Sequence, residues 1–202
     1  MLEYPQHLHL PGKYIQAKIS EFLVEDMPNG DVTTDNIISR KVHVKAEIQA
    51  VEKLTFAGAE IVPYFFSSNC SVKMYKTDGE IAESGETLAQ IKGPAHIILS
   101  HERVMLNLIQ RLCGIASESR KYVQYAKSYN VKILDTRKMT PGLRLFEKYA
   151  IAVGGAFNHR LNLSEGILIK DNHIKSAGSV TTALNSVMGS NTDLPLELEV
   201  DN

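Results

Sequence analysis

The amino-acid sequence predicts an α/β protein in two parts, a small sheet-rich region followed by repeated βα units. Three observations support this prediction. Apolar and polar residues alternate with a period of two within the stretch 41–100, helical spacing of three and four takes over at 100–128, and short apolar runs separated by helical stretches follow residue 130. The 202 residues are 44% apolar, which is enough to bury a core and excludes a disordered chain.

The first part is expected to form a small mixed or antiparallel sheet with few long helices. Positions 42, 44, 46, 48 and 50 are apolar, which is the period of a half-buried strand, and Cys70, Val72 and Met74 alternate again. Residues 77–80 indicate a turn. A second turn signal at 28–31 precedes 32–35, where Thr or Asp could cap a short helix.

A long helix is predicted from Ser100 to about Ser128, with Ser100 and Glu102 able to open it. Its apolar residues at helical spacing are Val104, Leu108, Ile109, Leu112 and Ile115. Gly114 lies inside this pattern and costs roughly 1 kcal/mol relative to Ala, so it indicates a break or a close packing contact. We place the domain boundary there, giving domains 1–113 and 114–202.

The remaining chain favours a parallel sheet with covering helices. The predicted strands are 131–134, 150–153, 166–169 and 196–200, and the clearest helices are 141–149 and 176–188. Pro141 suits the first turn of its helix.

Composition and charge narrow the class of ligand. The formal net charge of −1 hides a segment, 135–175, that carries +3 while the remainder carries −4. Such a distribution indicates a focused site for small anions, whereas a nucleic-acid-binding protein usually has a whole basic face. Cys70 and Cys113 lie 43 positions apart, which indicates neither a disulfide framework nor a thiolate metal site.

The same survey indicates a cytoplasmic protein without nucleic-acid or membrane partners. No apolar run approaches the ~18 residues of a membrane span. Residues 1–10 lack the basic and apolar regions of an export signal.

Polar residues follow each predicted strand of the second part, where parallel α/β proteins build their sites. They are 135–138 (Asp-Thr-Arg-Lys), 158–160 (Asn-His-Arg), 170–173 (Lys-Asp-Asn-His) and 201–202 (Asp-Asn). Any one of these cations could be a solvated surface charge, but the coincidence favours one anion-binding mouth. Lys170 is the strongest case, because a lysine after a buried strand must reach solvent, a carboxylate or an anion.

The mixture of side chains favours a ligand with carboxylate and phosphate groups. Arg137 offers a planar fork, and Lys138 beside it offers a compact point charge. A metal site on His159 and His173 is the competing hypothesis, but a cation next to each His or three residues away would repel a metal ion.

The last predicted strand carries Glu197, Glu199 and Asp201 on one face. If that face points into the mouth, it can balance the basic cluster, stabilise a developing cationic sugar carbon, or hold Mg²⁺ bound to a pyrophosphate. A solvated edge strand is the alternative.

Taken together, these motifs resemble the quinolinate phosphoribosyltransferase family. The match runs in order from about residue 20 onward, and an ordered series is far more specific than one motif. The segments that carry it are 25–26 (ED), 30–34 (GDVTT), 101–116 (HERVMLNLIQRLCGIA), 135–144 (DTRKMTPGLR), 147–150 (EKYA), 154–155 (GG), 158–160 (NHR), 168–174 (LIKDNHI) and 197–201 (ELEVD).

The resemblance implies an N-terminal α/β sandwich domain followed by a partial α/β barrel, in a homodimer or higher assembly. It implies a pentosyltransferase of NAD biosynthesis that converts quinolinate and phosphoribosyl pyrophosphate into nicotinate mononucleotide, pyrophosphate and CO₂, with Mg²⁺ as cofactor.

Residue by residue, the resemblance implies roles for seven side chains. Arg137, His159 and Arg160 would grip the quinolinate carboxylates, and Arg103 would enter the site from the neighbouring subunit. Lys138 and Lys170 would meet phosphoribosyl or carboxylate oxygens. Glu199 would face the ribose and its metal ion, supporting the transition state.

A closed barrel of this kind takes about eight strands and ~250 residues, whereas four barrel strands are predicted here. We therefore expect an incomplete copy of the enzyme, with little or no turnover by the 202-residue chain alone. Two alternatives stay open: a non-catalytic anion-binding or assembly module, and a phosphoribosyltransferase-like protein of the molybdenum-transport neighbourhood that uses another substrate. The full set of cations argues against the second.

Overall fold

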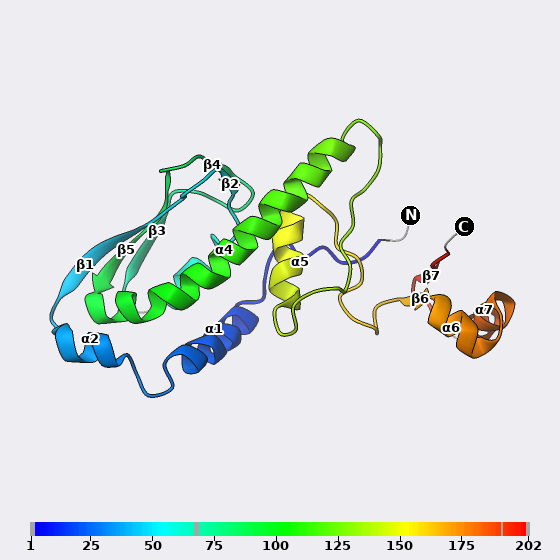
Figure 1. Ribbon diagram of the computed structural model, residues 1–202, viewed down its shortest axis with the longest axis horizontal. Helices are drawn as coiled ribbons and strands as arrows, with labels where there is room; N and C mark the ends of the chain where they lie inside the picture. Colours follow the sequence, from blue (N-terminus) through cyan, green and yellow to red (C-terminus); the bar gives the residue numbers. More distant parts are fainter. Residues whose placement is uncertain (1–2, 67–68, 191, 201–202) are drawn as a thin grey trace.

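The computed structural model describes residues 3–66, 69–190 and 192–200, and it confirms a mixed α/β chain with a sheet-rich first part (Figure 1). The helices are α1 (Gly12–Asp26), α2 (Val32–Ile37), α3 (Val62–Phe65), α4 (Ala95–Ala126), α5 (Arg144–Val153), α6 (Asp171–Ala177) and α7 (Val180–Met188). The strands are β1 (His43–Gln49), β2 (Leu54–Thr55), β3 (Ser71–Met74), β4 (Ile81–Ala82), β5 (Thr87–Pro94), β6 (Ile167–Ile169) and β7 (Leu196–Leu198). Within the described ranges, no helix is long and apolar enough to cross a membrane.

The first part contains an antiparallel sheet in the order β1-β5-β3, with β2 and β4 paired separately. The predicted alternation is confirmed, and burial increases along β1, from Val44 at 37% exposed to Ile48 at 7%. Asp31 caps α2 by accepting a hydrogen bond from the Thr34 backbone N at 3.0 Å. The turn at 77–80 is also confirmed, with Gly79 in the left-handed region at φ +85°.

Helix α4 crosses the sheet and extends to the second part of the chain (Figure 1). It begins at Ala95, five residues before the predicted Ser100, because β5 runs directly into it and the Ala95 backbone N still donates to the Val42 carbonyl. The buried residues in its central part are Met105, Leu108, Ile109, Leu112, Cys113 and Ala116.

The helix continues through Gly114 without a break. Apart from the neighbouring backbone of the helix itself, no atom of the described residues lies within 4 Å of where a Cβ on Gly114 would be. Gly114 therefore marks neither a break in the helix nor a close packing contact. The predicted domain boundary thus falls inside a continuous helix.

The predicted strand at 150–153 is wrong, because these residues form the last turn of α5. A short apolar run does not by itself distinguish a strand from a buried helix, and Phe146, Tyr149 and Ala150 pack into the core at helical spacing. Helix α5 begins at Arg144, three residues after Pro141. It lies close to α4: a Cβ on Gly154 would stand 2.5 Å from the Ala116 carbonyl oxygen.

The second part pairs its strands in parallel, as predicted for a partial α/β barrel. Strand β6 pairs with β7, from Ile167 opposite Leu196 to Ile169 opposite Leu198. The run 131–134 contributes one parallel bridge, between Leu134 and Phe157. The strand position after α5 is therefore at Phe157.

The predicted helix 176–188 is two helices. Gly178, with φ +90°, ends α6, and the Ser179 side chain caps α7 by accepting from the Thr182 backbone N.

A buried ion pair joins α5 to the loop after Leu134. Lys148 Nζ lies 2.5 Å from Asp135 Oδ1, and the two side chains are 0% and 1% exposed. Lys148 Nζ also donates to the His159 carbonyl at 2.8 Å. Burial lowers the pKa of Lys148, although the bond to Asp135 opposes this shift.

The two glycines give a stability test with opposite signs. Gly114→Ala should raise the free energy of unfolding by roughly 0.5–1 kcal/mol, since an exposed helix position gains from alanine. Gly154→Ala should lower it by roughly 1–3 kcal/mol, because the added methyl meets the α4 backbone. Urea unfolding measures both; equal effects would contradict this account of α4.

The buried pair gives a second test. Asp135→Asn should destabilise the fold by roughly 3–5 kcal/mol, because it leaves the Lys148 ammonium buried without its counter-ion. Glu83→Gln is the matched control, since its ion pair with Lys53 is exposed and is worth under about 1 kcal/mol. The double change Asp135→Asn with Lys148→Met should recover part of the loss. If Asp135→Asn lowers the free energy of unfolding by no more than Glu83→Gln does, the buried ion pair does not hold this region together.

Candidate active site

A cavity of about 390 Å³ opens where the strands of the second part end, and residues from four segments line it. The lining residues are Asp135, Thr136, Arg137, Lys138, His159, Arg160, Leu168, Lys170 and Glu199. The structure therefore brings together six of the seven predicted site residues, all except Arg103. Their convergence follows from the parallel strands, whose carboxyl ends meet at one edge.

Arg160 is the most buried cation of this cavity, at 6% exposed. Its Nη1 donates to the Gly166 carbonyl at 2.5 Å, whereas its Nε is buried and has no hydrogen-bond partner in the part of the chain that the structure describes. A buried donor without an acceptor is costly. The arrangement favours an anionic ligand.

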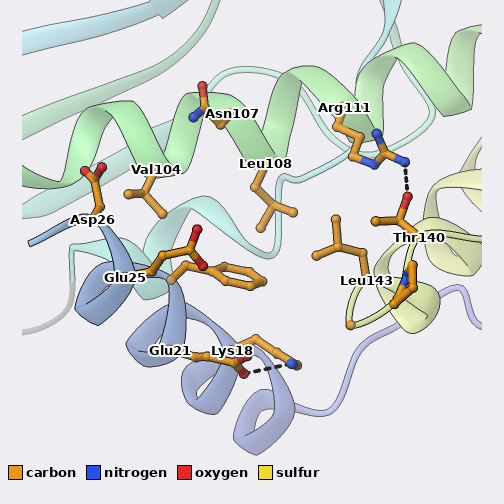
Figure 2. Close-up of a pocket in the computed structure, with 13 residues that line it drawn as sticks. Lys18, Glu21, Glu25, Asp26, Val104, Asn107, Leu108, Arg111, Thr140 and Leu143 are labelled. Atoms are coloured by element: carbon orange, nitrogen blue, oxygen red, sulfur yellow. Dashed lines mark hydrogen bonds and ion pairs between the residues drawn. The ribbon is translucent and has the colours of Figure 1, made fainter.

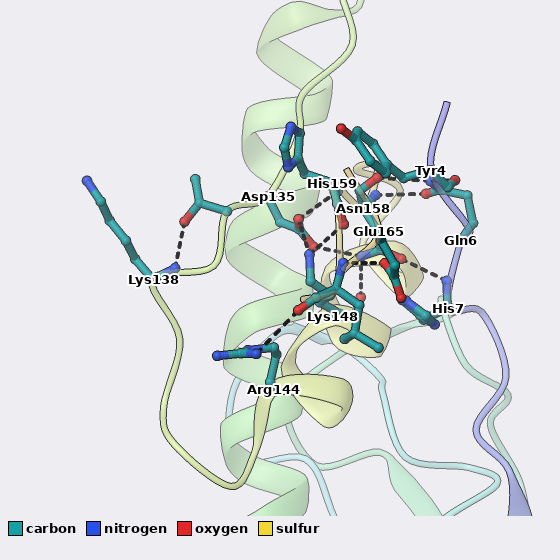
Figure 3. A network of polar contacts seen from close by, with 12 residues as sticks. Tyr4, Gln6, His7, Asp135, Lys138, Arg144, Lys148, Asn158, His159 and Glu165 are labelled. Atoms are coloured by element: carbon teal, nitrogen blue, oxygen red, sulfur yellow. Dashed lines mark hydrogen bonds and ion pairs between the residues drawn. The ribbon is translucent and has the colours of Figure 1, made fainter. Parts of the chain in front are cut away.

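Arg137 and Lys138 share the loop that follows Leu134. The Nε of Arg137 is also buried and without a hydrogen-bond partner among residues 3–66, 69–190 and 192–200. Lys138 is exposed, and its side chain points away from the buried network around Asp135 (Figure 3). The loop thus offers a planar guanidinium fork and a compact ammonium group to one ligand.

His159 is held by Glu197 from β7. The Nε2 atom of His159 lies 2.9 and 3.0 Å from the two carboxylate oxygens, and the Tyr4 hydroxyl donates to the same carboxylate at 2.8 Å. Burial alone would raise the pKa of Glu197, but the hydrogen bonds from His159 and Tyr4 outweigh it and lower that pKa. Burial and the bond to Glu197 raise the pKa of Tyr4 to about 12.

Lys170 and Glu199 form an ion pair across the ends of β6 and β7. Lys170 Nζ lies 2.8 Å from Glu199 Oε2, with the side chains 39% and 52% exposed. Because such an exposed pair is weak, Lys170 can exchange this carboxylate for a ligand oxygen at little cost.

The carboxylates of the cavity limit how a metal ion could bind. Asp135 is engaged with Lys148, Asn158 and His159, which leaves Glu199. Of the residues that are described, no three His, Cys, Asp or Glu are grouped so as to hold a metal ion. His173 does not line the cavity with His159; its Nδ1 accepts from the Lys170 backbone N at the start of α6. One carboxylate fits Mg²⁺ that keeps its waters and arrives with phosphates.

Sequence reasoning missed the support beneath the cavity (Figure 3). Asp135 accepts hydrogen bonds from Asn158 Nδ2 at 2.8 Å and from the His159 backbone N at 2.7 Å. Gln6 and the His7 backbone bond to Asn158 from the N-terminal segment. The motifs 147–150 and 158–160 contain Lys148 and Asn158, but no periodicity identifies Tyr4 or Gln6.

A second cavity, of about 550 Å³, lies between α1, α4 and the loop 140–143 (Figure 2). Glu25 and Asp26 line it, as does Arg111, which bonds to Thr140 and Glu147. Arg103 is exposed on α4 and lines neither cavity. Its entry into a neighbouring subunit's site stays a prediction.

On the last predicted strand, Glu197 supports His159 and Glu199 lines the basic cavity. Strand β7 ends at Leu198, although the Glu199 backbone N still donates to the Ile169 carbonyl. Asp201, the third carboxylate of the predicted face, lies outside the described residues.

Two family models match this chain. Residues 31–113 match the N-terminal domain of quinolinate phosphoribosyl transferase, and residues 115–202 match its C-terminal domain. A probable nicotinate-nucleotide pyrophosphorylase [carboxylating] of Bacillus subtilis is 42% identical over an alignment of 196 residues, and the alignment covers 93% of this chain and 68% of the relative. The Mycobacterium leprae enzyme of that name is 37% identical, covering 91% of this chain and 66% of the relative.

Solved structures agree in fold. The nicotinate-nucleotide pyrophosphorylase of Francisella tularensis superposes with a TM-score of 0.92 at 32% identity, over 99% of this chain and 72% of that one. NadC of Streptococcus pyogenes gives 0.90 at 36% identity, over 96% and 70%. The chain spans about two thirds of the length of the curated relatives that it matches. With both domain models matched in order and the fold shared along almost its whole length, the chain belongs to the quinolinate phosphoribosyltransferase family.

Proposed function

We propose that this chain forms the quinolinate-binding part of an enzyme that transfers a phosphoribosyl group from phosphoribosyl pyrophosphate to quinolinate and releases CO₂. The other products are nicotinate mononucleotide and pyrophosphate, so the reaction serves NAD biosynthesis. The proposal rests mainly on one observation. Arg160 and Arg137 line the same cavity, and the buried Nε of Arg160 has no hydrogen-bond acceptor among the described residues. Quinolinate has two neighbouring carboxylates on a flat ring, and two guanidinium forks suit them.

The side chains that line the cavity bind different parts of the two substrates. Arg137, His159 and Arg160 hold the carboxylates of quinolinate. Lys138 and Lys170 meet oxygens of the phosphoribosyl group or of a carboxylate. Glu199 faces the ribose, where a carboxylate stabilises the positive charge that develops at the anomeric carbon.

The order of the bond changes follows from the charge on the ring. The ring nitrogen bonds to the anomeric carbon as the carbon–oxygen bond to pyrophosphate breaks. The nitrogen is then quaternary, so it stabilises the electron pair left on the adjacent carbon when CO₂ departs, and a proton takes up that pair. The protein's part is mainly to position the substrates and to stabilise charge.

Mg²⁺ and a second subunit belong to the same proposal. Bound Mg²⁺ would neutralise charge on the departing pyrophosphate, and Glu199 would be the carboxylate that contacts it. Arg103 would come from the partner in a homodimer, because within one chain it lies outside the cavity. The cytoplasm is the proposed location, and both cysteines are free thiols, as a reducing compartment favours.

The reaction is tested by CO₂ release from carboxyl-labelled quinolinate. A protein that extends this chain to the length of its relatives should release label only when phosphoribosyl pyrophosphate and Mg²⁺ are both present. Lys138→Met should lower the rate at least tenfold, whereas Lys53→Met, an exposed lysine in the first part, should leave it unchanged. Binding of quinolinate without release of label would favour the anion-binding module instead, and binding of neither substrate would reject both hypotheses.

The role of the guanidinium fork is tested at Arg137. Arg137→Lys should weaken quinolinate binding by roughly 1.5–3 kcal/mol, because a point charge cannot replace two parallel hydrogen bonds. Arg40→Lys is the matched control, since Arg40 is 66% exposed and pairs with Asp35. Titration calorimetry measures both, and unchanged affinity in the first variant would place Arg137 outside the binding site.

A further inference from the structure

The N-terminal strap, defined here as residues 3–11, runs from the end of the molecule that holds β6 and β7 back to α1 (Figure 1). Hydrogen bonds attach the strap to the rest of the chain near both of its ends. The Leu10 backbone N donates to Glu60 Oε1 at 2.8 Å, and the Tyr4 hydroxyl donates to Glu197 at 2.8 Å. Tyr4 and Leu10 are only 7% and 8% exposed. The strap is therefore anchored in the fold by Tyr4 and Leu10.

Between these ends the strap bonds to the residue that precedes His159. The Gln6 side chain accepts from the Asn158 backbone N at 2.8 Å and donates to the Asn158 carbonyl at 3.1 Å. The His7 backbone N donates to Asn158 Oδ1 at 2.8 Å. These three hydrogen bonds fix the backbone from which the His159 ring projects.

Tyr4 contacts both His159 and the residue whose carbonyl holds Arg160. Its ring lies 4.5 Å from the His159 ring, centroid to centroid. It also lies against Gly166, where an added Cβ would stand 2.7 Å from the Tyr4 hydroxyl oxygen. The Gly166 carbonyl accepts the hydrogen bond from Arg160. The Tyr4 side chain thus touches both His159 and Gly166, the residue that binds Arg160.

The hydrogen bonds around Glu197 decide which nitrogen of His159 a ligand can use. Both carboxylate oxygens of Glu197 lie within 3.0 Å of Nε2, so this nitrogen carries a hydrogen and donates it. The Nδ1 atom has no hydrogen-bond partner in the described segments of the chain, and His159 lines the cavity. A carboxylate anchored in this way orients an imidazole and selects its tautomer.

We propose that Tyr4 and Glu197 are positioning residues, which hold the His159 ring through Nε2 so that Nδ1 faces the anionic substrate. Because Nδ1 of the neutral ring is only an acceptor, the ring takes up a second proton from solvent at Nδ1 when the substrate binds, and Nδ1 then donates a hydrogen bond to the substrate carboxylate. Neither side chain lines the basic cavity, so both act through His159. The binding part of this inference rests on the proposed function, because it takes quinolinate as the anion. The orientation of the ring is independent of any ligand.

The first measurement is the nitrogen NMR spectrum of the histidine side chains in the free 202-residue protein at pH 8. His159→Ala identifies the signal by its disappearance. The wild-type signal should have the signature of the Nε2–H tautomer. Tyr4→Phe, which keeps the ring and removes the hydroxyl donor, should shift it or make it a mixture of tautomers, and Glu197→Gln should do so more strongly. Tyr125→Phe is the control, since Tyr125 is 76% exposed on α4.

The second measurement is a double-mutant cycle on quinolinate affinity. Tyr4→Phe should raise the dissociation constant about five- to tenfold, the scale of one lost hydrogen bond. In a His159→Ala background the same change should have no effect, because the group that it positions is gone. A purely structural role would give equal losses in both backgrounds.

The two measurements separate failure of this inference from failure of the proposed function. A His159 signal that is the same in wild type, Tyr4→Phe and Glu197→Gln overturns the inference whether or not a ligand binds. An affinity loss that persists without His159 also overturns it. If wild type binds no quinolinate, the proposed function fails, and the NMR spectra alone decide whether Tyr4 and Glu197 orient the ring.

Discussion

The candidate site depends on the hydrogen bonds and the ion pair that the Asp135 carboxylate makes. The carboxylate receives the Lys148 ammonium, the Asn158 amide and the His159 backbone N, and these groups join α5, the loop after Leu134 and the loop after Phe157. Cations gathered around one cavity repel each other, so their loops need an anchor that is itself anionic. A buried carboxylate bonded to three donors meets that need, since its own desolvation is offset by those bonds.

Much of the site could be predicted from sequence because parallel strands impose a simple rule. Residues that follow such strands meet at one edge, so Arg137, His159 and Lys170 could be assigned to one mouth without a structure. The rule was insensitive to errors in strand placement. The strand predicted at 150–153 is helical and the pairing occurs at Phe157, yet Asn158 and His159 still follow the strand position. The prediction of the site depended on the order of the segments along the chain and not on the exact bounds of each strand.

The missed features depend on contacts between residues distant in sequence. Tyr4 and Glu197 are 193 positions apart, and nothing local to either predicts their hydrogen bond. A lysine in a helix is normally expected at the surface, and the burial of Lys148 is explained only by its ion pair with Asp135. The early start of α4 was missed for a different reason: β5 enters the helix with no loop between them, so no turn signal marks the change.

The unbroken course of α4 bears on how such chains can evolve. The two family models meet between residues 113 and 115, in the middle of this helix. Recombination at that junction would divide the helix into two pieces, each separated from half of the core that they share. An exchange that keeps the fold must transfer the whole helix with one of the two parts, so the sequence-defined modules are not interchangeable building blocks.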